Sequence, residues 1–270
     1  MSLIFKILVI LFAIYILIAI VFYFFQHLFF FRPEKLHSKF TYKYPFPFEE
    51  HTFEMEDGGL INSIYFRVPN RRGVIFYLKG NSRSIKGWGK FAKDFLSNGY
   101  DFFMMDYRGF GKSKGRRTQE KIFNDVENLY SWLLEKYTED KIVLYGRSWG
   151  SGVAAYLAGQ HHPRMLILDS PYLNFYYTIH RYLPFVPLRF LMRYDIRTDE
   201  YLSKATCPIH IIHGTKDRLI PYEQSLQLKN LYPGKITLHP IEGAKHNNLP
   251  EYKKFFEVLY DVLYLNPASK

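Results

Sequence analysis

Hydrophobic residues are distributed unevenly along the chain, and their pattern changes after the first thirty positions. Residues 7–31 include no charged side chain, and the apolar run is interrupted only by two tyrosines, Gln26 and His27. About 20 apolar residues suffice to cross the hydrocarbon core of a bilayer. The pattern therefore predicts a single membrane-spanning anchor over residues 1–31, with its many phenylalanines after position 21 at the membrane–water interface.

A cleaved signal peptide is the alternative interpretation of this segment. The apolar run exceeds the roughly 7–15 residues usual in signal peptides, and no small-x-small cleavage site follows it. One basic residue, Lys6, precedes the apolar run, whereas four lie within positions 32–43. Because basic residues concentrate on the cytoplasmic side, we expect the domain formed by residues 32–270 to be cytoplasmic.

Beyond the anchor, short apolar runs alternate with segments that show helical periodicity. The first two runs, 50–55 and 60–68, flank a glycine turn and predict an antiparallel pair. The repeated strand–helix units that follow predict a mainly parallel sheet with helices on both faces. Further strands are expected at 73–78, 100–105, 141–145, 165–168, 209–213 and 235–240, and helices at 87–98, from 118, and at 149–160, 223–231 and 250–265.

The motif Gly146-Arg147-Ser148-Trp149-Gly150 joins the strand at 141–145 directly to a helix. A G-x-S-x-G sequence in this context is typical of a nucleophile elbow, a tight turn that lifts the serine hydroxyl out of the sheet edge. The pattern predicts Ser148 as the nucleophile of a hydrolase.

A serine hydroxyl needs a base to take its proton and an acid to orient that base. His246, between the last strand and the last helix, is the expected base, and Asp217, after the strand at 209–213, is the expected acid. Asp169, at the end of the preceding strand, is the alternative acid. The oxyanion of the intermediate needs backbone N–H donors, for which we expect the amides of Asn81 and Trp149.

The chain resembles the α/β-hydrolase superfamily over residues 73–265. The resemblance rests on the loop from Asp106 to Ser113 (Asp-Tyr-Arg-Gly-Phe-Gly-Lys-Ser), on Gly-Arg-Ser-Trp-Gly, on His-Gly-Thr-Lys-Asp and on Gly-Ala-Lys-His. With its anchor, the chain is most similar to the single-pass, bud-emergence-protein-like branch, related to serine-aminopeptidase-like and monoacylglycerol-lipase-like enzymes. That branch usually carries His-Gly-Asn where this chain has Lys79-Gly80-Asn81. The resemblance implies a serine hydrolase that uses no cofactor.

Composition and charge narrow the possible partners. The net charge is +11, and basic runs near the expected site suit an anionic lipid surface or substrate group, although a solvated basic surface is the alternative. No nucleic-acid recognition motif or metal-ligand spacing is present, so neither nucleic acid nor a metal is expected. The single cysteine, Cys207, excludes an internal disulfide.

Residues 171–201, rich in aromatic side chains, are expected to form a small cap over the site, and a small helical subdomain that packs its own apolar face is the alternative. The predicted function is that of a membrane-anchored serine hydrolase that cleaves an ester or thioester of an apolar acyl group. Its expected partners are a small-molecule acyl substrate and membrane lipid. A serine aminopeptidase or amidase of the same fold is one alternative, and a non-catalytic binding protein with this fold is another.

Overall fold

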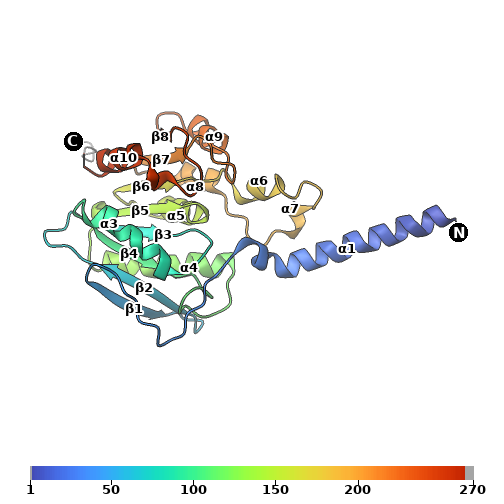
Figure 1. Cartoon of the computed structure of the whole chain (residues 1–270), viewed down its shortest axis with the longest axis horizontal. Coiled ribbons are helices and arrows are strands. Elements are labelled where there is room, and N and C mark those ends of the chain that lie inside the picture. The colour runs from blue at the N-terminus through green and yellow to red at the C-terminus, as the bar shows by residue number, and fades with distance from the viewer. Residues whose placement is uncertain (1, 265–270) are drawn as a thin grey trace.

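The computed structural model describes residues 2–264, which are built around an eight-stranded sheet (Figure 1). The strands lie in the order β1-β2-β4-β3-β5-β6-β7-β8. β2 is antiparallel to both β1 and β4, and every other neighbouring pair is parallel. The predicted mainly parallel sheet is therefore confirmed. The strands are β1 (Phe48–Glu54), β2 (Leu60–Phe66), β3 (Val74–Leu78), β4 (Asp101–Met105), β5 (Ile142–Arg147), β6 (Met165–Asp169), β7 (Ile209–Gly214) and β8 (Ile236–Ile241).

Helices cover both faces of the sheet, as the alternating pattern predicted (Figure 1). The α-helices are α1 (Leu3–Phe30), α2 (Ile85–Trp88), α3 (Ala92–Leu96), α4 (Gln119–Leu134), α5 (Trp149–Gln160), α6 (Phe175–His180), α7 (Leu188–Leu191), α8 (Thr198–Lys204), α9 (Glu223–Leu231) and α10 (Lys253–Tyr264). Short 3-10 turns are η1 (Gly89–Phe91), η2 (Glu139–Lys141) and η3 (Leu249–Glu251).

Two of the predicted helices differ from the structure in their bounds. The single helix predicted at 87–98 is divided into α2, η1 and α3, because Gly87 and Gly89 favour helix weakly and the ring of Tyr44 occupies the space beside Gly89. The last helix begins at Lys253 rather than at 250, after the 3-10 turn η3. Its expected last residue, 265, lies outside the described residues.

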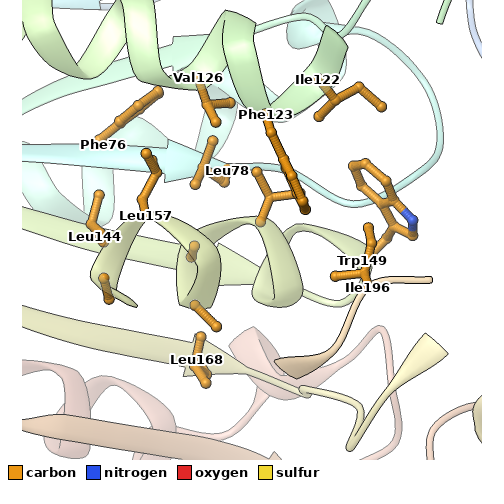
Figure 2. Close-up of a cluster of buried hydrophobic side chains, with 14 of the residues drawn as sticks. Phe76, Leu78, Ile122, Phe123, Val126, Leu144, Trp149, Leu157, Leu168 and Ile196 are labelled. Atoms are coloured by element: carbon orange, nitrogen blue, oxygen red, sulfur yellow. The ribbon is translucent and has the colours of Figure 1, made fainter. Parts of the chain in front are cut away.

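The hydrophobic core forms two layers, one on each face of the sheet. On one face, buried strand residues such as Phe76 and Leu144 pack against Val126 of α4 and Leu157 of α5 (Figure 2). On the other face, α3 and α10 cover the sheet through residues such as Phe95 and Leu259. With helices fixed on both faces, the carboxyl ends of the parallel strands and the loops that follow them meet at one edge.

The long helix α1 projects away from this body (Figure 1). Its most apolar 18-residue window has a mean hydropathy of 3.1 and is 6% buried, so α1 is long and apolar enough to cross a membrane. The end of the helix behaves differently, because Gln26, Phe30 and the following Phe31 are buried against the domain. α1 and the domain therefore share a packed junction.

Candidate active site

Ser148 lies in the turn between β5 and α5 with φ 52° and ψ −122°, a conformation that non-glycine residues rarely adopt. The flanking glycines are required by close packing. A Cβ on Gly146 would lie 2.6 Å from the Cβ of Ala154, and one on Gly150 would lie 2.1 Å from the carbonyl oxygen of Leu78. The local sequence therefore forms the expected sharp turn at the centre of the sheet.

The structure brings Ser148, His246 and Asp217 together in a line of hydrogen bonds. The Oγ of Ser148 is 2.9 Å from Nε2 of His246, and Nδ1 of His246 is 2.6 Å from Oδ2 of Asp217. The three residues follow β5, β8 and β7, respectively. Nearly 100 residues separate the serine from the histidine, and they meet because these parallel strands end at the same edge of the sheet.

Asp217 is held by four hydrogen bonds. Its Oδ1 accepts the backbone N–H groups of Leu219 and Ile220, each at 2.9 Å. Its Oδ2 contacts His246 and also Nε2 of His213, the latter at 3.1 Å. Burial raises the pKa of the Asp217 carboxyl, but the hydrogen bonds from His213 and His246 outweigh burial and hold that pKa below its ordinary value. The carboxylate is therefore ionised at neutral pH.

Asp169, the alternative acid, has different partners. Its carboxylate accepts the hydroxyl of Tyr145 at 2.9 Å and that of Ser170 at 3.1 Å, and it lies 3.5 Å from Nε of Arg147. Its backbone carbonyl accepts the N–H of Ser148. Asp169 thus supports the turn of the serine, whereas Asp217 contacts the histidine.

His213 is a site residue that the sequence analysis did not identify. Its Nε2 lies 2.9 Å from the carbonyl oxygen of Ile220, and its Nδ1 lies 2.6 Å from the hydroxyl of Ser225. Because a carbonyl can only accept, Nε2 carries the proton and donates to both Ile220 and Asp217, and Nδ1 accepts from Ser225. A histidine four residues before the expected acid was the available signal, but its place on a strand concealed it.

Arg147, inside the serine motif, is the second residue that sequence reasoning missed. It is buried, and its guanidinium lies 5.1 Å from the centre of the Phe91 ring and 5.4 Å from that of Trp88. It also donates to the carbonyl oxygen of His246 at 3.4 Å. Arg147 therefore links the turn of the serine to the loop of the histidine.

The two expected oxyanion donors lie on the loops that flank Ser148. The amide of Trp149 is the first of α5, where helical N–H groups have no acceptor within their own helix. The loop after β3 passes close by, since a Cβ on Gly80 would lie 3.7 Å from that of Ser148. The side chain of Asn81 donates to the carbonyl of Phe30, and the Asn81 carbonyl accepts the N–H of Arg32 at 2.9 Å. The loop is thus tied to the end of α1.

Lys79, the departure from the usual His-Gly-Asn sequence, is fully buried beneath this loop. Its Nζ lies 3.4 Å from Asp106, donates to the Arg83 carbonyl at 3.3 Å and sits 3.8 Å from the centre of the Phe110 ring. Burial lowers the pKa of the Lys79 ammonium and raises that of the Asp106 carboxyl, because the interior disfavours both charged forms. Lys79 therefore belongs to the internal packing of the loop.

Comparison with known proteins finds similarity to hydrolases. The family described as "Serine aminopeptidase, S33" matches residues 69–194. The chain is 27% identical over 212 residues to alpha/beta hydrolase domain-containing protein 17C of Xenopus tropicalis, covering 76% of this chain and 66% of the relative. It is 29% identical over 220 residues to lysophosphatidylserine lipase ABHD12 of Danio rerio, covering 70% and 58%, respectively. The chain therefore spans somewhat less than two thirds of the length of these relatives.

Solved structures share the fold. The Pyrococcus furiosus esterase Pf2001 matches with a TM-score of 0.66 and 19% identity, covering 87% of this chain and all of that one (100%). The α/β-hydrolase GrgF from a Penicillium species matches with a TM-score of 0.67 and 15% identity, covering 83% and 100%. The chain therefore has the fold of the α/β hydrolases and is similar to esterases and lipases, and the predicted fold class is confirmed.

Proposed function

We propose that this protein is a membrane-anchored serine hydrolase that cleaves an ester or thioester bond of a lipid-like, acylated substrate. The observation that carries the proposal is the continuous line of hydrogen bonds from Ser148 through His246 to Asp217. Such a line is the arrangement that activates a serine hydroxyl for acyl transfer. The name of the lipase relative from Danio rerio supports a lipid substrate.

In the proposed reaction, Nε2 of His246 takes the proton of Ser148 while Oγ attacks the acyl carbon. The amides of Asn81 and Trp149 stabilise the oxyanion, and the ionised Asp217 stabilises the imidazolium and keeps its Nδ1 proton in place. His246 then donates the proton to the departing alcohol or thiol, which leaves an acyl group on Ser148. A water molecule, deprotonated by His246, hydrolyses this acyl-enzyme and restores the serine.

Two observations support the membrane and lipid parts of the proposal. α1 is apolar over most of its length and mostly exposed, as a helix surrounded by lipid is expected to be. The cap segment carries Phe185 and Phe190, which are 88% and 85% exposed. Two such exposed aromatic side chains beside an apolar helix are typical of a surface that meets a membrane or an apolar ligand.

The proposal is tested with the full chain, because residues 31–44 pack on the domain and a shorter fragment would lose the contacts of Phe31 and Arg32. Ser148→Ala should abolish labelling by a fluorophosphonate probe and leave only the roughly 10³–10⁴-fold residual acceleration that binding and the oxyanion donors provide. Wild-type turnover in purified Ser148→Ala protein would show that another residue is the nucleophile.

An amidase or aminopeptidase is the second candidate, because the matching family carries the description "Serine aminopeptidase". The same three residues serve both reactions, and the leaving group distinguishes them. p-Nitrophenyl esters, acyl-thioesters and aminoacyl anilides should be compared on one preparation. Faster turnover of the anilides than of the esters and thioesters would favour the aminopeptidase.

A further inference from the structure

A cavity of about 510 Å³ lies at the base of α1, between that helix, the loop after β4 and the segment after α7. Phe24 and Leu28 of α1 form its apolar wall. None of the residues that line it is acidic, and its basic lining residues, besides His27, are Lys35, Arg108, Arg116, Arg117 and Arg193. The cavity therefore joins an apolar wall to a concentration of positive charge.

Some basic residues at or near the cavity are neutralised by carboxylates. Arg108, for example, lies 2.6 Å from Asp57 and 2.7 Å from Asp125. By contrast, no residue between positions 2 and 264 forms an ion pair with the side chain of Arg116 or Arg193, or with that of Lys35.

Arg117 adds a buried donor to this set. Its Nε is buried and has no hydrogen-bond acceptor within residues 2–264. Its guanidinium carbon lies 4.1 Å from the centre of the Phe31 ring. Cationic side chains gathered around a cavity raise the local concentration of anions, and a buried donor without an acceptor is costly until a ligand accepts from it.

The position of the cavity along α1 indicates which kind of anion it would bind. A helix rises about 1.5 Å per residue, so Leu3 and Phe24 lie about 31 Å apart along α1, close to the ~30 Å thickness of a bilayer core. With α1 across the membrane, Phe24 and Leu28 lie where the hydrocarbon meets the headgroups. The basic residues of the cavity then lie at the level of the lipid phosphates.

We propose that this cavity binds the phosphate headgroup of an anionic membrane phospholipid, whose acyl chains extend along α1. Guanidinium groups match the geometry of phosphate oxygens, and the apolar wall matches the upper part of the acyl chains. The ring of Phe31, against which Arg117 lies, is 5.1 Å from the ring of Trp149, the residue after Ser148. A bound lipid is thus separated by one aromatic layer from the residue next to the proposed nucleophile.

The site rests on the membrane anchoring proposed above, but its test does not depend on catalysis: lipid binding is measured on the full chain carrying Ser148→Ala, so that no probe is consumed. The protein is reconstituted in nanodiscs of phosphatidylcholine alone and in nanodiscs of equimolar phosphatidylcholine and phosphatidylglycerol. The lipid molecules that stay bound to the protein are then counted by native mass spectrometry. We expect preferential retention of phosphatidylglycerol, and a loss of about tenfold in that preference for Arg116→Glu combined with Arg193→Glu.

The matched control is Lys39→Glu combined with Lys43→Glu, which reverses two exposed charges just after α1 outside the cavity. It should keep the preference, and Arg116→Lys combined with Arg193→Lys, which keeps the charge but not the guanidinium geometry, should lose less of it than the glutamate pair. Equal retention of the two lipids, or an equal loss in the control, would overturn the proposal. Displacement of the lipid by inorganic phosphate would also overturn it, since the site would then belong to a soluble phosphate compound.

Discussion

At the scale of single residues, two aspartates near Ser148 have separate tasks. Asp217 binds His246, whereas Asp169 binds Tyr145 and Arg147. Asp217→Asn should lower kcat by about 10⁴, because an amide no longer stabilises the imidazolium or the correct tautomer. Ester hydrolysis by the purified variants measures this loss. Asp169→Asn is the matched control and should lose far less, and a reversed order would make Asp169 the orienting acid.

A second residue-scale prediction concerns Asp94 in α3, whose pKa burial raises to about 6, with Lys93 acting in the opposite direction. The pKa of Asp94 is higher in the folded protein than in the unfolded chain. In acid the carboxyl is neutral and costs no folding stability, but its ionisation destabilises the fold increasingly as the pH rises towards 6. Asp94→Asn should therefore stabilise the protein above pH 7 by about 1 kcal/mol, discounted for partial exposure.

Thermal unfolding of the detergent-solubilised protein measures this effect. The midpoint of Asp94→Asn should lie about 2–4 °C above that of the wild type above pH 7 and nearly coincide with it near pH 4. Asp140→Asn is the control, because a hydrogen bond from Thr138 lowers the pKa of that exposed carboxyl. It should not raise the midpoint, and an equal gain there would show that burial of Asp94 is not the cause.

At the scale of elements, the last turns of α1 hold both the predicted cap, residues 171–201, and the loop that carries Asn81, the proposed oxyanion donor. The side chain of Gln26 donates to the carbonyl of Leu191 and accepts the N–H of Arg193, each at 2.8 Å. Asn81 donates to the carbonyl of Phe30. A polar residue buried in an otherwise apolar helix therefore has a structural task, and α1 is part of the architecture around the site.

We therefore expect Gln26→Ala to loosen the cap without unfolding the domain. Each lost hydrogen bond costs about 1 kcal/mol, so protection of the Arg193 amide against hydrogen exchange should fall by about tenfold. Ile10→Ala, on an exposed part of α1, is the control and should change nothing at the cap. Unchanged protection in Gln26→Ala would mean that the cap is held by its other contacts alone.

At the scale of the whole molecule, α1 lies beside the tip of the predicted cap, and both carry exposed apolar side chains. The hydroxyl of Tyr15, midway along α1, donates to the carbonyl of Phe185 at 3.1 Å. Figure 1 shows α7 beside the helix. If α1 crosses the bilayer, the exposed ring of Phe190 lies in hydrocarbon, and the sheet edge that carries Ser148 faces the membrane surface.

This orientation predicts that tryptophan at position 190 contacts acyl chains. In reconstituted Phe190→Trp protein, brominated lipids should quench the added fluorescence relative to the wild type. Leu231→Trp, at an exposed position of α9, is the matched control and should not be quenched. Equal quenching of both variants, or of neither, would contradict the orientation.

The sequence by itself determined most of the strands and helices and the order of the expected site residues. Strands and helices are encoded in local periodicity, and Ser148, Asp217 and His246 could be identified because each follows a predicted strand. Only the tertiary structure decided how distant segments combine. The basic runs contain no acidic residue of their own, yet the fold places Asp57 and Asp125 against Arg108 and leaves Arg116 and Arg193 without an ion pair among residues 2–264.

The dependence on tertiary packing also explains why the sequence did not reveal the tasks of His213 and Lys79 or the contact between α1 and Asn81. Their tasks arise from contacts between residues far apart in the chain, or from burial, and neither leaves a periodic trace in the sequence. The pattern of apolar residues specifies which faces must be covered. Which side chains contact one another in the core is determined only when all the elements pack together.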